Sequence, residues 1–461
     1  MKKAIPSNHK RVTSLLLAGV MTCTLPLTGC TNTKQPAAEP TQGTPATTAA
    51  EPLTKTTEPV VRTTDPEPTE APTTQAPSTE VPTDPEVRKN ISLNDQYNTF
   101  ALEVLKRTAD STEDNVMVSP LSLMLALSMT ANGANGDTAK EMLSVLGGDL
   151  TMEELNQLLD AYSASLPSTA EAKFSIANSI WYKDHPDVVI REDFLSKNQR
   201  YYSADIFPAP FDGSTIDAIN NWVKGKTDGM IDKLVNELTP DARMVLVNAI
   251  LFDGQWEEQY YENQINRLTF TDARGNSKTV EQMCSEENYY LSGKNCTGFM
   301  KPYKGGKYAF VGLLPDAETT PEKLISNMTA ESLKDLLANA RRREVNVRIP
   351  KFTFDYSTSM KEFLQKMGMN LAFDKDWADF SKMSEKERLF ISDVIHKTRV
   401  EVTEKGTRAA AATAVIMDAV SCVMPEEPLN VFLDRPFVFM IVDTEQNLPI
   451  FIGRVNSIEE E

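Results

Sequence analysis

A long run near the N-terminus contains nothing that could build a hydrophobic core, so folding is restricted to the rest of the chain. Residues 31–89 hold sixteen threonines, eleven prolines and no aromatic residue. Such a segment buries too little apolar surface to offset the entropy lost on ordering. The sequence therefore predicts a disordered Thr/Pro-rich linker over residues 30–89, stiffened by its prolines, and one folded domain over residues 90–461.

The segment that precedes this linker has the pattern of an export signal. The first 29 residues carry four basic residues and no acid, and residues 12–27 are an apolar stretch too short and too threonine-interrupted for a membrane span. The stretch ends in LTGC (residues 27–30), which resembles the lipobox of bacterial lipoproteins; the alternative is an ordinary signal peptide followed by a chance cysteine. We expect residues 1–29 to be a lipoprotein signal peptide. Cys30 would then carry the lipid that anchors an exported protein at the cell surface, on the extracellular side of the membrane.

The charge of the chain limits its partners. The formal net charge is −18 at pH 7. Nucleic acids and anionic membranes repel a surface of this kind, because both carry the same sign of charge. We therefore expect no nucleic-acid partner, and contact with the membrane through the lipid anchor only.

Side chains that carry chemistry are sparse. Beyond the signal the chain has two histidines, His185 in a turn-like context and His396 in a strand pattern, and three cysteines, Cys284, Cys296 and Cys422. The odd number leaves at least one cysteine as a free thiol or paired with another molecule. Neither CxxC nor a zinc spacing is present, and GxSxG, HExxH, P-loop and GxGxxG motifs are absent. The sequence predicts no catalytic residue, no metal site, no cofactor, and a protein that is not an enzyme.

Helical patterns come mostly early in this domain and strand patterns mostly late. Residues 94–110 place apolar side chains on one stripe, and residues 119–129 are apolar nearly all round, with Ser119 as N-cap and Pro120 at the first helical position. A third helical pattern covers residues 219–235. Strand-like runs follow at residues 242–256, 307–315, 344–354, 389–402 and 437–455. The last run is two strands around a polar turn, which indicates a hairpin, and the segregation predicts an α+β fold rather than alternating βαβ units.

The stretch GTRAAAATAV (residues 406–415) stands out because it follows the alternating run 394–405 with a series of very small side chains. Alanine has the best helix propensity, so the four alanines could form a turn of helix. The flanking glycine, threonines and valine are poor helix formers and favour another interpretation. A small, β-compatible segment can slide between existing strands, and Gly406 would supply its hinge.

At this stretch the sequence resembles the serpin family, because EKGTRAAAATAV is similar to the hinge of the family's reactive loop. Further stretches are similar to other serpin signatures in the family's order, namely residues 115–142, 219–231, 246–256, 395–407 and 434–455. Together they span nearly all of residues 90–457. The resemblance implies the serpin fold, an α+β arrangement of three β-sheets and about nine helices, with an exposed reactive loop at one pole.

The resemblance also implies an activity. Serpins inhibit serine proteases, and in some members cysteine proteases, as suicide substrates. The protease cleaves the loop, is held as an acyl-enzyme, and is dragged along when the freed loop inserts as a central strand. About 15 inserted residues of ~3.3 Å each would carry it on the order of 50 Å. We expect this chain to be a monomeric inhibitor of that kind.

The family's functional residues correspond to residues of this chain. The hinge corresponds to Glu404, Gly406, Thr407, Ala409, Ala410, Ala411 and Ala412. In the family, a group of residues lies where the central strands part, together with an aromatic residue at the top of that sheet. We call this group the sheet-opening cluster. It corresponds to Ser119, Ser122, Asn248, His396 and Trp256. Arg408 departs from the family, which usually has an acid at a position expected to face solvent after insertion.

Counting along the loop with the family's spacing places the cleaved bond. Counting forward from Glu404 puts it between Val420 and Ser421, whereas counting back from Arg435 gives a later bond, because the C-terminal side of the loop is long. We take the count from the hinge, since inhibition depends on the length that inserts. Val420 indicates elastase-like or subtilisin-like targets.

Two other interpretations stay open. The first is a non-inhibitory serpin that acts as a binding or structural protein. Bulky or proline residues in the hinge would indicate it, and the four alanines offer none. The second is an enzyme that uses the fold for hydrolysis, which would need a histidine beside a nucleophile.

Overall fold

The computed structural model describes residues 93–459 of the chain, except 239–241, 387 and 408–428. By its contacts the chain divides into two units, Met1–Val81 and Pro82–Glu461, and all described residues belong to the second. Several predictions from the sequence lie outside the described residues: those on the signal peptide, the linker, Cys30, Ala409, Ala410, Ala411, Ala412, Val420, Ser421 and Cys422.

Nine α-helices occur among the described residues. Their bounds are α1 (Leu93–Asp110), α2 (Pro120–Ala131), α3 (Gly136–Leu146), α4 (Met152–Ala164), α5 (Glu192–Tyr202), α6 (Gly213–Lys226), α7 (Pro321–Asn327), α8 (Ala330–Ala338) and α9 (Lys361–Lys366). α2 begins as the sequence predicts: the Ser119 hydroxyl accepts the backbone N–H of Ser122 at 3.3 Å, and nearly all of the helix is buried. α6 ends at Lys226, so the helix stops earlier than the pattern over residues 219–235 predicted.

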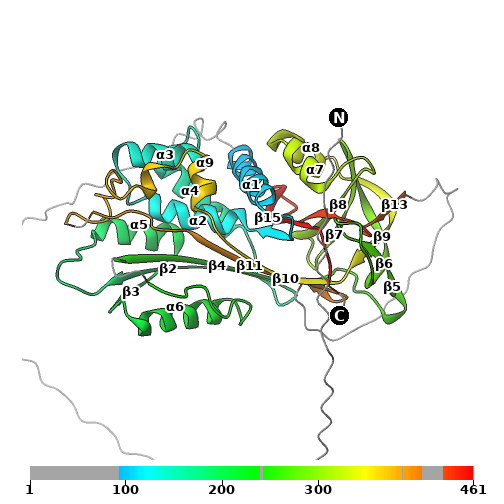
Figure 1. Cartoon of the computed structure of the whole chain (residues 1–461), viewed down its shortest axis with the longest axis horizontal. Helices are drawn as coiled ribbons and strands as arrows, with labels where there is room; N and C mark the ends of the chain where they lie inside the picture. Colours follow the sequence, from blue (N-terminus) through cyan, green and yellow to red (C-terminus); the bar gives the residue numbers. More distant parts are fainter. Residues whose placement is uncertain (1–92, 239–241, 387, 408–428, 460–461) are drawn as a thin grey trace, which may run out of the picture. The chain divides into compact units, whose positions relative to one another are not determined.

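One sheet has six strands in the order β10-β11-β12-β4-β2-β3. Their bounds are β10 (Phe352–Ser359), β11 (Ile395–Thr403), β12 (Gly406–Thr407), β4 (Met244–Gln255), β2 (Ala172–Lys183) and β3 (Asp205–Ala209). Figure 1 shows α2, α3, α4, α5 and α9 on one face of this sheet and α6 on the other. Because α2 covers one face, alternate residues of β11 are buried, from His396 to Val402.

The other sheet has nine strands, with the path β1-β15-β14-β8-β7-β6-β9-β13 and β5 paired to β6. Their bounds are β1 (Val116–Val118), β5 (Ile265–Thr271), β6 (Ser277–Gly293), β7 (Cys296–Pro302), β8 (Tyr308–Pro315), β9 (Arg341–Pro350), β13 (Leu429–Phe432), β14 (Phe437–Asp443) and β15 (Leu448–Val455). The predicted hairpin at the C-terminus is β14 and β15. The long strand β6 pairs with β7 near one end and with β5 and β9 along the rest. Two of the three sheets that the resemblance implies are therefore joined through β6 into one.

Two strand patterns read from the sequence differ from the structure. The run 344–354 is two strands rather than one, because β9 pairs with β6 while β10 pairs with β11 in the other sheet. The break falls at Lys351, whose backbone N–H donates to the carbonyl of Glu281 at 2.9 Å. The run 389–402 becomes a strand only from Ile395. In the first run the apolar alternation shifts by one residue at Lys351, from Val345, Val347 and Ile349 to Phe352 and Phe354.

Aromatic side chains join the two sheets. Phe352 of β10 packs edge-on against Phe439 of β14 with ring centroids 5.5 Å apart, and Trp256, just after β4, packs edge-on against Phe310 of β8 at 5.9 Å. These contacts fix one end of the six-stranded sheet to the nine-stranded sheet. Within the described part of the chain, no helix is long and apolar enough to span a membrane.

Candidate functional site

The two-residue strand β12 lies between β4 and β11 and pairs with both. Thr407 is opposite Val402 on β11 and Gly254 on β4, while Gly406 is opposite Thr403 and Gln255. Both pairings are antiparallel. The first residues of the alanine-rich stretch therefore already form the beginning of a central strand.

Gly406 occupies a position that only glycine fits. Its φ is +157°, and a Cβ built on its backbone would collide with the carbonyl oxygen of Gly254 and lie 2.9 Å from the Cα of Gln255. A side chain here would push β12 away from β4. The hinge role assigned to Gly406 from the sequence thus has a second reason, which is the close approach of two backbones.

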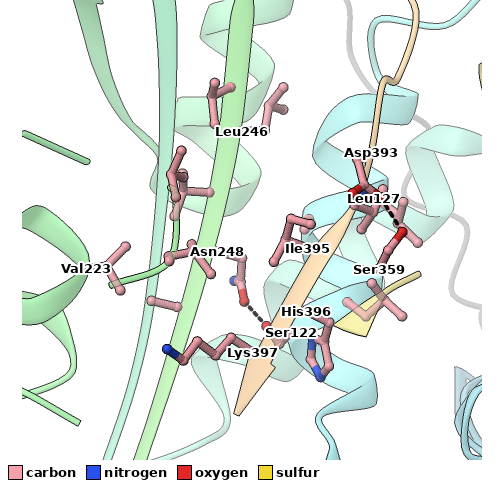
Figure 2. A pocket seen from close by; sticks show the side chains of 18 of the residues that line it. Ser122, Leu127, Val223, Leu246, Asn248, Ser359, Asp393, Ile395, His396 and Lys397 are labelled. Atoms are coloured by element: carbon pink, nitrogen blue, oxygen red, sulfur yellow. Dashed lines mark hydrogen bonds between the residues drawn. The ribbon is translucent and has the colours of Figure 1, made fainter. Parts of the chain in front are cut away.

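Past Thr407, no strand among the described residues continues between β4 and β11. A pocket of about 990 Å³ lies there instead, with β4 and β11 at its sides and α2 at its base. Figure 2 shows this arrangement, with Ser122 and Asn248 pointing toward one another in the space between the strands and His396 on the side of β11. The pocket has the backbone edges of two strands along its length.

His396 connects β11 with the start of α2. Its Nε2 accepts the backbone N–H of Ser119 at 3.0 Å. The Ser119 hydroxyl in turn donates to the carbonyl of Ile450 in the other sheet at 2.9 Å. Burial lowers the pKa of His396 to about 4, so the ring is neutral at physiological pH and can act as this acceptor.

Asn248 forms the corresponding connection on the β4 side. The Ser122 hydroxyl donates to its Oδ1, and its Nδ2 donates to Oδ1 of Asn178 on β2 at 2.7 Å. Asn178 then donates to the carbonyl of Tyr202 at 2.7 Å. Four members of the sheet-opening cluster thus lie at the pocket as two pairs, His396 with Ser119 and Asn248 with Ser122.

Trp256, the fifth member, lies beside the start of β12 and is fully buried. Its Nε1–H donates to the carbonyl of Thr403 at 2.9 Å, and its ring stacks on Tyr303 with centroids 4.6 Å apart. The Tyr303 hydroxyl lies 2.5 Å from the Thr407 hydroxyl, and burial raises the pKa of Tyr303. Trp256 and Tyr303 therefore form one wall against the first residues of the hinge.

Glu404 is held at the turn between β11 and β12. Its carboxylate lies 2.9 Å from Nζ of Lys351, which also pairs with Glu281 at 2.8 Å. Burial by itself raises the pKa of Glu404, but the hydrogen bond from Lys351 brings it below its ordinary value. The Glu404 backbone carbonyl accepts the N–H of Tyr260 at 3.0 Å.

Sequence reasoning missed several residues of this site: Asn178, Tyr260, Tyr303 and Lys351. Nothing local in the sequence marks them, because each acquires its role through a strand pairing or a contact across the sheet. Lys351 offers the nearest to a signal, since it lies where the apolar alternation of residues 344–354 shifts by one residue.

The described residues contain no group of three or more His, Cys, Asp and Glu side chains able to hold a metal ion. His185 is exposed and lies 3.4 Å from the carboxylate of Asp187. Cys284 and Cys296 are free thiols, the first partly exposed and the second buried. The chemistry that this arrangement supports is strand addition: two strand edges, Gly406 and Thr407 already paired between them, and a pocket that continues from Thr407.

The fold and the site thus define a protein whose central sheet contains the start of its own loop as a strand. A family model described as serpin (serine protease inhibitor) matches residues 95–458. The chain belongs to the serpin family. Both the family and the fold predicted from the sequence are confirmed.

Individual relatives support this assignment. The leukocyte elastase inhibitor A of Rattus norvegicus is 33% identical over 382 residues, covering 79% of this chain and 99% of that protein. The crystal structure of tengpin, a thermophilic serpin, in the native state has a TM-score of 0.75 and 44% identity, and covers 80% of this chain and 96% of that one. The complex of thyroxine-binding globulin with thyroxine has a TM-score of 0.70 and 25% identity, with 80% and 100% covered.

Proposed function

We propose that this chain inhibits serine proteases as a suicide substrate, and that it does so as a monomer held outside the cell by a lipid on Cys30. The observation that carries the inhibitory part is the position of β12 between β4 and β11. The anchored, exported state rests on the LTGC stretch alone.

The register of β12 supports insertion of the residues that follow it. A strand that continued antiparallel from Thr407 would place Thr413 between Asn248 and His396. The backbone groups along β4 and β11 would then gain partners, each hydrogen bond contributing roughly 0.5–1.5 kcal/mol net. The pocket supplies the space for this strand.

The faces of such a strand fit the side chains of the loop. Residues paired across a sheet point to the same face. Thr407 and its partner Val402 are buried, so Ala409 and Ala411 would also point toward α2. Arg408 would point away from α2. Two of the four alanines would therefore lie on the crowded face, and Arg408 would lie on the other face with the remaining two.

The inhibitory step begins as ordinary proteolysis. The hydroxyl of the protease serine attacks the carbonyl carbon of Val420, the bond to the nitrogen of Ser421 breaks, and the new amino terminus takes up a proton. The acyl-enzyme now has two fates. Water can hydrolyse it, or insertion of the freed segment can carry the protease about 50 Å and distort its active site first.

The target class follows from the residue on the acyl side of the bond. Val420 presents a small aliphatic side chain, which suits the specificity pockets of elastase-like and subtilisin-like proteases. The name of the similar leukocyte elastase inhibitor agrees with this choice. In this role the chain is consumed in the reaction and turns over nothing itself, so we propose that it is not an enzyme.

A non-inhibitory role as a binding or structural protein is the second candidate. The similarity to thyroxine-binding globulin favours it, because a protein of this fold is there seen in complex with a small molecule. The alanine-rich hinge and the docked β12 favour the inhibitor, since a protein that never inserts its loop has no need of small residues there.

Covalent trapping separates the two candidates. The mature chain is incubated with elastase-like, subtilisin-like and trypsin-like proteases, and complexes that survive SDS are sought by gel electrophoresis. We expect such a complex with the first two classes, and none when the catalytic serine of the protease is replaced by alanine. Cleavage of the loop by every protease without a stable complex would favour the non-inhibitory protein.

A further inference from the structure

A buried ion pair lies beneath the turn that precedes the hinge. The side chains of Lys301 on β7 and Glu287 on β6 are 2% and 8% exposed, and Nζ lies 2.6 Å from Oε1. Charged groups so deeply buried are rare, because their removal from water is costly unless they are paired and hydrogen-bonded. Neither residue lines the pocket between β4 and β11 or belongs to the sheet-opening cluster.

Two aromatic rings cover the Lys301 ammonium group. Its Nζ lies 4.5 Å from the ring centroid of Tyr260 and 5.6 Å from that of Trp256. A desolvated cation is attracted to the faces of aromatic rings. The Ser285 hydroxyl donates to Glu287 Oε1 at 2.7 Å, and its oxygen lies 3.0 Å from the Tyr260 hydroxyl. The ion pair therefore fixes both rings.

The same two aromatic residues hold the turn between β11 and β12. The Trp256 side chain donates to the carbonyl of Thr403 at 2.9 Å, and its backbone N–H donates to the carbonyl of Lys405 at 3.0 Å. The backbone N–H of Tyr260 donates to the carbonyl of Glu404, also at 3.0 Å. Three successive carbonyl groups ahead of Gly406 thus bind the two residues whose rings cover Lys301.

We propose that Lys301 and Glu287 are positioning residues for loop insertion. Through Trp256 and Tyr260 they hold residues 403–405 in place, so that β12 stays paired with β4 and β11 and the residues after it are directed into the sheet. The inference rests on the proposed function. Because insertion competes with hydrolysis of the acyl-enzyme, a loosened turn slows insertion and lets more protease escape intact.

The test measures the number of inhibitor molecules consumed per protease molecule inactivated. Lys301→Met removes the charge while keeping much of the length, and Glu287→Gln removes the charge while keeping the shape. We expect each to raise the excess of this stoichiometry over one roughly threefold to tenfold, because ~0.7–1.4 kcal/mol between the two competing barriers changes the ratio of hydrolysis to insertion by that factor. The rate of loop cleavage should not change, since the cleaved bond is remote from the pair in sequence and the pair acts after acylation.

A double variant distinguishes positioning from mere stability. Replacing both partners of a buried ion pair by apolar residues often restores stability, whereas removing one leaves a buried charge unpaired. In Lys301→Met/Glu287→Met the midpoint of thermal unfolding should return toward that of the wild type, while the stoichiometry stays raised because the cation is still missing from the two rings. Recovery of both quantities together would overturn the proposal.

A matched control breaks a different ion pair, one with a fully buried cation. Nη1 of the buried Arg454 lies 2.8 Å from Oε1 of Glu322, whose side chain is 38% exposed. Glu322→Gln should lower the unfolding midpoint and leave the stoichiometry at the wild-type value. A raised stoichiometry in this control would show that any loss of stability has the same effect, and would also overturn the proposal.

Failure of the proposed function can be told from failure of this inference. If the wild type traps no protease, its loop is cut with subtilisin, and insertion is followed as a rise of the unfolding midpoint with time. A slower rise in Lys301→Met supports the positioning role, and equal rates contradict it. If the cut wild type shows no rise, the loop does not insert and the proposal fails as well.

Discussion

Nε2 of His396 lies 3.0 Å from the backbone nitrogen of Ser119 and accepts its N–H, which joins β11 to the residue that caps α2. On the other side of the pocket, Asn248 of β4 accepts from the Ser122 hydroxyl, one turn further along. α2 is therefore bonded to both strands that border the pocket. A strand that enters between them must pass these contacts.

Replacing His396 should destabilise the uncleaved protein. In His396→Ala the backbone N–H of Ser119 loses its buried partner, which costs roughly 1–3 kcal/mol. Thermal unfolding of the intact protein measures the loss, and we expect a lower midpoint. His185→Ala serves as the control, because that side chain is exposed. Equal midpoints for wild type and His396→Ala would contradict the role given to this residue.

His396 should also make stability depend on pH. Burial lowers its pKa to about 4 in the folded protein, against about 6.5 in an unfolded chain. Between these values the unfolded chain binds a proton that the folded chain does not. The free energy of unfolding should therefore rise with pH from about 4 to about 6.5. When the pH falls through this range, His396 should lower the free energy of unfolding by about 3 kcal/mol.

Urea unfolding of wild type and His396→Ala across this pH range isolates the effect, because the carboxylates are common to both proteins. The wild type should lose stability more steeply than the variant as the pH falls below about 6.5. Parallel profiles would mean that the folded protein takes up the proton without cost, and that the ring is not held neutral.

Ala410→Pro should turn the inhibitor into a substrate. Proline lacks the backbone N–H and fixes φ near −65°, so it does not fit the middle of a central strand. The loop should be cleaved at an unchanged rate while insertion stalls, and water should then release active protease. The assay compares inhibitor consumed per protease inactivated with the cleavage rate. As a control, Glu426→Pro lies on the far side of the expected bond and should still trap protease. If Ala410→Pro trapped protease at the wild-type stoichiometry, the alanine-rich stretch would not be an inserting strand.

The bond between Val420 and Ser421 should be the one that an elastase-like protease cuts. Mass spectrometry of the C-terminal peptide released on denaturation should give a fragment that begins at Ser421. Val420→Arg should shift inhibition toward trypsin-like proteases, since their specificity pocket selects a basic side chain. A fragment that begins at Val423 would favour the count back from Arg435.

Cys30 should carry the membrane anchor. Cell fractionation should find the wild type with the membrane and the Cys30→Ala variant not retained there, because acyl chains supply the hydrophobic attachment. Metabolic labelling with a fatty acid should mark the wild type only. Recovery of the wild type in the medium, unlabelled, would indicate an ordinary signal peptide instead.

Much of this protein is determined by local sequence. The buried helix α2 follows from the Ser119 cap, Pro120 and an apolar run, and the hairpin of β14 and β15 follows from two apolar runs around a polar turn. The small side chains after Gly406 likewise predict, from the sequence alone, a segment that can insert as a strand. Side-chain size, backbone freedom and the period of apolar residues are properties of neighbouring residues, so the sequence carries them directly.

The tertiary structure alone decided which residues meet. That Gly406 faces the backbone of Gly254, that the run through Lys351 is split between two sheets, and that Lys301 lies under Trp256 all depend on the pairing of strands. Such pairing is selected by the free energy of the whole core, in which each strand competes for several possible neighbours. No local pattern encodes that choice, and for this reason the support beneath the hinge is visible only in the folded protein.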